Sequence, residues 1–456
     1  MNPYGKYGLF ALSSLLLGGL LLTGCGGGGS GDGLSRSSAS GTSVPLSAVN
    51  ATSKGSYLVV AWNDLGMHCL NPDYDTAVIL PPYNTLWAQV IQRSNPPRLV
   101  TSGITVEYRI VNNTYSYGKR SYGGFWDYAL KLFGVSLQRD TGLNLDDPQV
   151  RNGLSGTMLS KGDHFQASGI PVTPVSDNNS WNPYQVAEIS VKDRSGNVVA
   201  KTRTTIPTSD EINCAKCHGS TPFQDILVKH DAMHGTSLVG RKPVLCAGCH
   251  GSPVLGQQGA GSSGKYLSQA IHGSHASRGA TCYDCHPGNN TKCSRSLAHT
   301  APDGNCRKCH GTMANVASSV SSGARTPWLG EPACSACHTG VAGVSTGTAL
   351  YRASSGHGGI YCEGCHGSPH ATIPSREDSD NYQAIQYQGA AKTLASCGAC
   401  HSGSRGKSGN FLEQHGNGRT PSACNICHTG FTNPSTDRWP HAFQWKNRSG
   451  AGTVRD

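Results

Sequence analysis

The hydrophobic residues follow different patterns in successive parts of the chain. Residues 9–22 form an apolar run that glycine interrupts and that is shorter than the about 20 residues needed to span a membrane. Residues 56 to about 210 contain short apolar runs such as YLVVAW, LWAQVIQ and ITVEYRIV, which are typical of strands. No other long apolar segment follows. The pattern therefore predicts a β-rich domain over residues 56–210 and a different kind of structure over residues 211–456.

The strand pattern favours an all-β fold for the first of these domains. Residues 186–205 predict a hairpin with Ser195-Gly196 in its turn, and a short helix is expected around residues 126–133. We expect a β-sandwich of immunoglobulin-like character. For residues 211–456 we expect short helices and much irregular structure.

The first 24 residues predict a signal peptide. Lys6 supplies a positive charge before the apolar run, and the run ends in LTGC at residues 22–25. This ending resembles the bacterial lipobox, in which the cysteine, here Cys25, becomes the lipidated first residue. The alternative is an ordinary cleavage site followed by a free cysteine. Because Gly26 rather than aspartate follows, we expect an outer-membrane lipoprotein.

Composition argues against a large aliphatic core. The chain of 456 residues has 59 glycines, 24 prolines and 19 cysteines, and only 14% of its residues are charged. Residues 25–55 are small and polar, as in a flexible tether. The formal charge of +10 does not indicate nucleic acid as a partner, because lysine and arginine are scattered and export is predicted.

Sixteen of the 19 cysteines form eight copies of C-x-x-C, and a histidine follows each copy directly. Two thiols at this spacing reach the two vinyl groups of one haem, and the next residue brings its imidazole under the iron. Disulfides or zinc knuckles are the alternatives, but neither needs a histidine at the same offset every time. We therefore predict eight haem c groups. The motifs, numbered 1 to 8 in chain order, are Cys214, Cys217 and His218; Cys246, Cys249 and His250; Cys282, Cys285 and His286; Cys306, Cys309 and His310; Cys334, Cys337 and His338; Cys362, Cys365 and His366; Cys397, Cys400 and His401; and Cys424, Cys427 and His428.

The close spacing of the motifs indicates that the haems supply most of the apolar interior. From Cys214 to Cys424, seven intervals average 30 residues, which leaves too little chain for a separate aliphatic core around each haem. The porphyrins must then pack against one another and against short helices. Closely packed haems are also what electron transfer requires.

Further histidines are candidates for the distal, sixth ligand of each iron. They are His230, His234, His272, His275, His299, His357, His370, His415 and His441. Because His230 and His234 share one helical face, as do His272 and His275, we expect one ligand from each pair. Seven candidates would then remain for eight irons. The last position is left to His68, Met67, Met233 or Met313, or stays open.

The segment NDLGMHC at residues 63–69 concentrates soft-metal ligands outside the haem motifs. Met67, His68 and Cys69 could serve copper or a haem, although three adjacent residues do not close easily on one ion. The alternative is a buried turn in which Cys69 is free or forms a disulfide with Cys293, the other unassigned cysteine. The sequence favours the disulfide without deciding the question.

With its eight motifs, lipobox and Gly/Ser tether, the chain resembles the outer-surface multihaem c-type cytochromes of metal-respiring bacteria. NDLGMHC followed by ILPPYNTL is also similar to a pattern of that group. The resemblance implies electron transfer from other multihaem cytochromes or porin–cytochrome complexes to extracellular acceptors such as metal oxides. No catalytic residue is predicted. The alternatives are an oxidoreductase acting on a small nitrogen or sulfur compound at a five-coordinate haem, and a subunit of a cytochrome filament.

Overall fold

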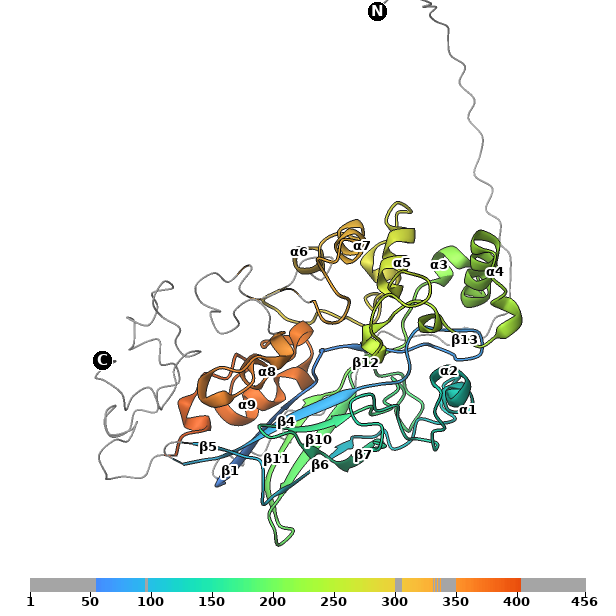
Figure 1. Ribbon diagram of the computed structural model, residues 1–456. Coiled ribbons are helices and arrows are strands. Elements are labelled where there is room, and N and C mark those ends of the chain that lie inside the picture. Colours follow the sequence, from blue (N-terminus) through green and yellow to red (C-terminus); the bar gives the residue numbers. More distant parts are fainter. Residues whose placement is uncertain are drawn as a thin grey trace, which may run out of the picture. The chain divides into compact units, whose positions relative to one another are not determined.

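A computed structural model describes residues 55–94, 97–299, 306–330, 332, 334, 337 and 350–402 (Figure 1). All of these residues belong to one compact unit, residues 38–456. Several predicted features lie outside the described residues: the signal peptide, Cys25, most of the tether, His338, His415, motif 8 and His441, together with the side chains of His357 and Cys397.

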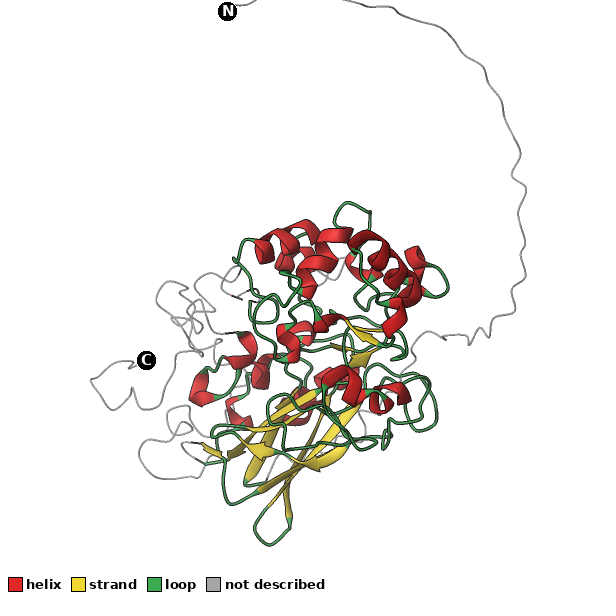
Figure 2. Cartoon of the chain, turned by 45° about the vertical axis from the view of Figure 1, so that its right-hand side comes forward, coloured by secondary structure: helices red, strands yellow, loops and turns green. Residues whose placement is uncertain are grey.

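Two antiparallel sheets form the β-rich part, and Figure 2 shows their strands apart from most of the helices. The first sheet has the order β1 (Tyr57–Trp62), β4 (Thr85–Gln92), β9 (Phe165–Ser168) and β8 (Leu159–Ser160), with β5 (Arg98–Val100) also paired to β4. The second has the order β11 (Val198–Thr205), β10 (Val186–Lys192), β6 (Thr105–Ile110) and β7 (Ser155–Thr157).

The predicted hairpin of residues 186–205 is present as β10 and β11. Its turn needs Gly196, whose φ of +83° lies in the left-handed region, and the Asp193 carboxylate accepts hydrogen bonds from the backbone N–H groups of Ser195 and Asn197. The helix expected around residues 126–133 forms as two short pieces, α1 (Gly123–Asp127) and α2 (Ala129–Phe133).

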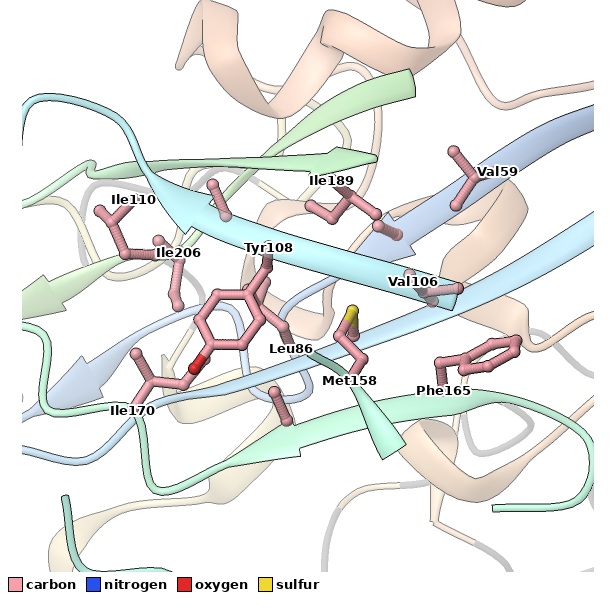
Figure 3. Packing of buried hydrophobic residues seen from close by; sticks show 14 of the residues in the cluster. Val59, Leu86, Val106, Tyr108, Ile110, Met158, Phe165, Ile170, Ile189 and Ile206 are labelled. Carbon is pink, nitrogen blue, oxygen red and sulfur yellow. The ribbon is translucent and has the colours of Figure 1, made fainter. Parts of the chain in front are cut away.

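One hydrophobic core is shared by the two sheets. Side chains of β1 and β4, such as Val59 and Leu86, meet side chains of β6 and β10, such as Tyr108 and Ile189 (Figure 3). Strand β6 alternates between exposed and buried positions, as expected when one face of a sheet packs on a core. The immunoglobulin-like topology stays a prediction.

The other face of β1 is covered by the region that carries the haem motifs. Leu58, Val60 and Trp62 pack with Tyr361, which directly precedes helix α8 (Cys362–His366). From α9 (Tyr382–Gln388), Gln383 accepts a hydrogen bond from the backbone N–H of Ala61 at 2.8 Å. Figure 1 shows α8 and α9 beside β1 and β4. Because β1 is buried on both faces, its sequence is continuously apolar rather than alternating.

Two short parallel pairings lie near the domain boundary expected at residue 210, and the second of them crosses it. Strand β2 (His68–Cys69) pairs with β12 (Thr208–Ser209), and β3 (Ala77–Val78) pairs with β13 (Val244–Leu245). The described residues on the two sides of this boundary are therefore in direct contact. The division into residues 56–210 and 211–456 stays a prediction.

The described residues after residue 210 form mainly short helices and irregular segments, as expected. Their α-helices are α3 (Ala215–His218), α4 (Pro222–His234), α5 (Leu267–His275), α6 (Cys306–His310), α7 (Met313–Ser321), α8 and α9. Large apolar side chains remain exposed here, among them Val228, Met233 and Leu329. Within the described part of the chain, no helix is long and apolar enough to cross a membrane. The polypeptide by itself supplies little apolar interior in this region, which fits the expectation that porphyrins supply it.

Glu188 is a buried carboxylate that ties β10 to both neighbouring strands. Its carboxylate forms ion pairs with Arg109 at 2.6 Å, with Lys201 at 2.8 Å and with Arg203 at 3.0 Å. Burial raises the pKa of Glu188, but the hydrogen bonds from these cations outweigh burial and lower the pKa to about 2. The stabilisation is present above the pKa of an unfolded glutamate and is lost as the pH falls toward 2.

We predict that Glu188→Gln lowers the free energy of unfolding at pH 7 by about 1–3 kcal/mol, because it removes charge-assisted hydrogen bonds. The loss should shrink between pH 4.5 and 2, where Glu188 itself becomes protonated. Denaturant unfolding followed by circular dichroism measures both effects. Glu107→Gln removes a more exposed pair with Lys192 and is the control, with an expected cost below about 1 kcal/mol. Equal losses for the two variants would contradict the prediction.

Candidate haem-binding sites

Each described motif closes a turn that places its two thiols and its imidazole together. In motifs 1, 2 and 3 the backbone N–H of the histidine donates to the carbonyl of the first cysteine, at 2.9, 3.1 and 2.8 Å respectively. Motif 4 forms α6 and motif 6 forms α8. A helical turn brings residues three and four apart onto one side. The geometry that haem attachment needs is therefore set locally by the chain.

In motifs 1 to 4 the proximal histidine lies opposite a second histidine. The ring centres are 6.3 Å apart for His218–His275 and for His250–His230, and 6.2 Å apart for His286–His272 and for His310–His370.

The spacing of these pairs fits an iron between the two rings. Metal–nitrogen bonds of about 2 Å, with each nitrogen about 1.1 Å from its ring centre, require about 6.3 Å between centres. The angle between the ring planes differs from pair to pair, but this is no obstacle, because each ring can rotate about its own bond to the metal. The side chains of motifs 1 to 4 thus fit bis-histidine haem.

The distal histidines are oriented through their Nδ1 atoms. These atoms hydrogen-bond to Thr236 Oγ1 (His230, 2.9 Å), the Ser268 carbonyl (His272, 2.7 Å), the Ile271 carbonyl (His275, 2.8 Å) and the Leu65 carbonyl (His370, 2.9 Å). Such a bond fixes the tautomer and aims Nε2 at a metal. Anchored in this way, each of these rings would present Nε2 to an iron.

Two proximal histidines have anchors of different character. His218 Nδ1 lies 2.7 Å from the Asp225 carboxylate, whereas His250 Nδ1 lies 2.9 Å from the Ser263 hydroxyl. A carboxylate partner increases the basicity of the imidazole more than a neutral partner does. The sequence analysis did not single out Asp225, although its position seven residues after His218, on the next helix, was an available signal.

The two histidine pairs that share a helix behave differently from each other. On α4, His230 faces His250, while the ring of His234 lies 4.8 Å from that of His230. On α5, however, both members face a motif: His272 lies opposite His286 of motif 3 and His275 lies opposite His218 of motif 1. The structure thus differs from the expectation of one ligand per pair at α5, because two motifs approach the same helix.

Among the alternative ligands, His68 has its ligand atom engaged in another contact. His68 is buried, and its Nε2, the atom a haem iron would take, lies 2.9 Å from the Asp64 carboxylate. Met67 is buried and Met233 is exposed. Among the described residues, no group of three or more histidine, cysteine, aspartate or glutamate side chains is placed to hold a metal ion.

The motifs lie next to one another in a definite order. Lys216 of motif 1 forms a 2.6 Å ion pair with Asp284 of motif 3. Burial lowers the pKa of His310 in motif 4 to about 4. The nearby His370, and His286 of motif 3, lower it further. Motifs 1, 3 and 4 are therefore consecutive neighbours.

The thiols extend this order. Burial raises the pKa of Cys309, with a contribution from Cys337 of motif 5. Burial also raises the pKa of Cys362 in motif 6 to about 12, with contributions from Glu363 and then Cys334 of motif 5. Likewise burial raises the pKa of Cys400 to about 12, with a contribution from Cys365. Thiols of motifs 4 and 5, of motifs 5 and 6, and of motifs 6 and 7 thus lie within electrostatic range of each other. Helix α4 carries both Asp225, beside motif 1, and His230, beside motif 2.

For motifs 5 to 8 the pairing stays a prediction. The candidates His415 and His441 lie outside the described residues, as does the side chain of His357. Nδ1 of His299 lies 3.4 Å from the Thr372 hydroxyl.

Comparison with known proteins identifies the central part of this region. Residues 274–366 match the family model of cytochrome c3, and this segment contains motifs 3 to 6. This segment is therefore similar to a multihaem c-type cytochrome. No curated protein matches the sequence significantly. The crystal structure of MtrC from Shewanella baltica OS185 matches at 15% identity with a TM-score of 0.14, over 62% of this chain and 43% of that chain. This chain thus spans less than half of that structure, and so low a TM-score carries no argument about the fold.

The position of the two α5 histidines opposite two motifs leads to a prediction. His272→Ala and His275→Ala should each convert one haem from low spin to high spin, because each removes one axial ligand. His234→Ala is the matched control and should leave every haem low spin. Electron paramagnetic resonance of the ferric protein counts the two spin states. A high-spin signal in His234→Ala, or none in one of the α5 variants, would show that the pairing is wrong.

The Asp225 contact leads to a second prediction. Asp225→Asn should raise the midpoint potential of the haem at motif 1 by some tens of millivolts, a small part of the about 0.8 V that axial ligands span. The reason is that a less basic imidazole stabilises the ferric iron less. Lys229→Met is the control, because Lys229 pairs with the same carboxylate but its loss leaves the Asp225–His218 contact in place. Potentiometric titration measures the shift, and a positive shift in the control would contradict this explanation.

Proposed function

We propose that the protein transfers electrons through eight covalently bound c-type haems, one at each motif. The observation that carries the proposal is the pairing of the histidines in motifs 1 to 4 at the spacing of bis-histidine ligation. When bound, each haem supplies a one-electron ferric/ferrous couple. The chain's own residues hold both axial positions and fix the order of the motifs.

The supply of histidines favours a conduit over an enzyme. Because His272 and His275 both have a motif to serve, only His234 is surplus among the candidates. His299, His357, His415 and His441 then remain for motifs 5 to 8, so that every iron has two ligands. An oxidoreductase acting on a small nitrogen or sulfur compound needs an iron with an open position, and this arrangement leaves none.

The order of the motifs supports directional transfer along the molecule. The described motifs can be arranged in one series, 2, 1, 3, 4, 5, 6 and 7, in which consecutive members share a helix, an ion pair or an electrostatic interaction. Among the described motifs, this series has its ends at motif 2 and motif 7. We propose that electrons enter at one end and leave at the other.

We further propose that the protein works at the outer membrane or cell surface. Support comes from the signal-peptide pattern, the lipobox ending in Cys25 and the tether of residues 25–55. The partners would be other multihaem cytochromes or porin–cytochrome complexes on one side and extracellular acceptors, such as metal oxides, on the other. A filament subunit remains the second alternative, in which a histidine near the end of the chain, such as His441, serves a neighbouring copy.

The function can be tested on the purified full-length protein. We expect an intact mass that exceeds the processed polypeptide and its lipid by eight haems. The ferric spectrum should be entirely low spin, soluble ferric complexes should be reduced fast, and nitrite or hydroxylamine should not be turned over. A high-spin haem together with turnover of either compound would favour the oxidoreductase and reject the conduit. A mass with fewer haems would contradict the assignment of one haem to each motif.

A further inference from the structure

Two cysteines that belong to no haem motif lie on neighbouring segments. Cys69 is in β2 and pairs in register with Ser209 of β12. Residues opposite each other in adjacent strands point to the same face of a sheet. The Ser209 hydroxyl lies 2.9 Å from that of Thr291. The face toward which Cys69 points is therefore occupied by the segment that carries Cys293, two residues after Thr291.

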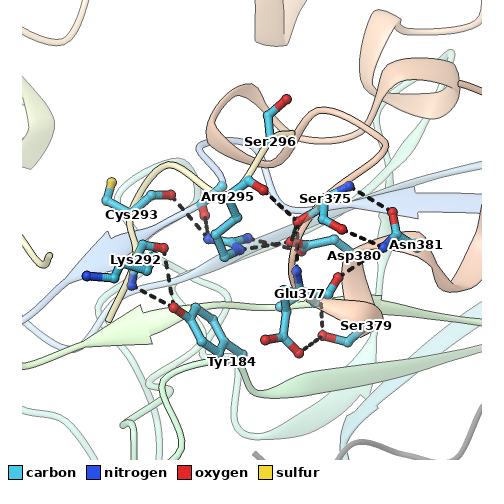
Figure 4. Close-up of polar contacts among 12 residues, drawn as sticks. Tyr184, Lys292, Cys293, Arg295, Ser296, Ser375, Glu377, Ser379, Asp380 and Asn381 are labelled. Carbon is cyan, nitrogen blue, oxygen red and sulfur yellow. Dashed lines mark hydrogen bonds and ion pairs between the residues drawn. The ribbon is translucent and has the colours of Figure 1, made fainter. Parts of the chain in front are cut away.

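A second contact fixes the same two segments. The side chain of Arg295, which is fully buried, donates to the carbonyl of Gly66 at 2.7 Å. It also forms an ion pair with Asp380 at 2.8 Å, and Figure 4 shows it at the centre of this network with Cys293 two residues away. Both thiols are free in this structure. Burial raises the pKa of Cys69 and the Cys293 thiolate adds to the rise, so the two sulfurs lie within electrostatic range of each other.

We infer that Cys69 and Cys293 form a disulfide that joins the β-rich region to the segment between motifs 3 and 4. Formation removes two protons and two electrons from the two thiols and makes one S–S bond. The electrons reduce a disulfide of a thiol–disulfide exchange oxidant, of the class that acts in exporting compartments, and the protons convert that disulfide to two thiols. Neither sulfur is then a metal ligand.

The disulfide fixes the surroundings of a haem ligand. His370 is held from both of the segments that the bond joins: its Nδ1 donates to the Leu65 carbonyl at 2.9 Å, and its carbonyl accepts from the backbone N–H of Arg295 at 2.7 Å. Gly66, next to Leu65, has a φ of +80°, and a Cβ there would lie 2.9 Å from the backbone nitrogen of His370. The two segments thus form a close cradle around His370, and the disulfide prevents them from separating.

Peptide mapping tests the bond itself and does not depend on any haem activity. The full-length protein is alkylated with N-ethylmaleimide under denaturing, non-reducing conditions and then digested. We expect one cross-linked peptide pair containing Cys69 and Cys293, and alkylation of both only after prior treatment with a phosphine reductant, which leaves thioether links intact. Alkylation of either cysteine without reduction in most molecules would overturn the inference.

The effect on His370 rests on the proposed haem ligation and has a separate readout. In Cys69→Ser, Cys293→Ser and the double variant, we expect the ferric haem of motif 4 to bind cyanide at least several-fold faster than in the wild type, because its distal ligand leaves more easily. The double variant should equal the single ones. Ser209→Ala, which removes the hydroxyl contact but keeps both thiols, is the control and should behave like the wild type. If the wild type shows the cross-linked peptide but the variants bind cyanide at the same rate as the wild type, the disulfide does not hold His370 in place. This outcome would leave the proposed electron transfer unaffected.

Discussion

Under the proposed function, pairing of two imidazoles across one iron is the constraint on which the haem-motif region depends. Two of the pairs join segments that are distant in sequence, His218 with His275 and His310 with His370. The ring spacing is set by metal–nitrogen bonds and leaves little freedom, so the short helices between the motifs must adapt to it. The Nδ1 contacts hold the rings in place from behind. This explains how a region rich in glycine and poor in buried apolar side chains can hold a definite arrangement.

The β-rich part has a supporting role in this arrangement. It has a conventional apolar core between its two sheets, and the outer face of β1 offers a second apolar surface to α8 and α9. It also reaches the haem ligands directly, since the Leu65 carbonyl orients His370. We interpret the β-rich part as a rigid platform against which the motif-bearing segments are positioned, rather than as an independent module.

The sequence was sufficient for the features that local chemistry determines. The C-x-x-C-H spacing predicted the haem motifs because two thiols and an imidazole must come from one turn, and the β10–β11 hairpin followed from its turn residues. The ligand pairs were less accessible. The spacing of His272 and His275 indicated that they share one helical face. Whether they face one motif or two is decided by tertiary packing. The anchoring of His370 by Leu65 joins residues far apart in the chain, and no local pattern reports such a contact.

Helix α5 has a consequence for how the two centres it serves behave in time. His272 and His275 are three residues apart on one α-helix. A displacement of that helix therefore shifts the proposed ligands of motifs 1 and 3 together. Two cofactors held by separate segments could move apart, whereas cofactors bound to these two histidines would move together. Electron transfer between these two centres should therefore depend little on motions of the surrounding loops.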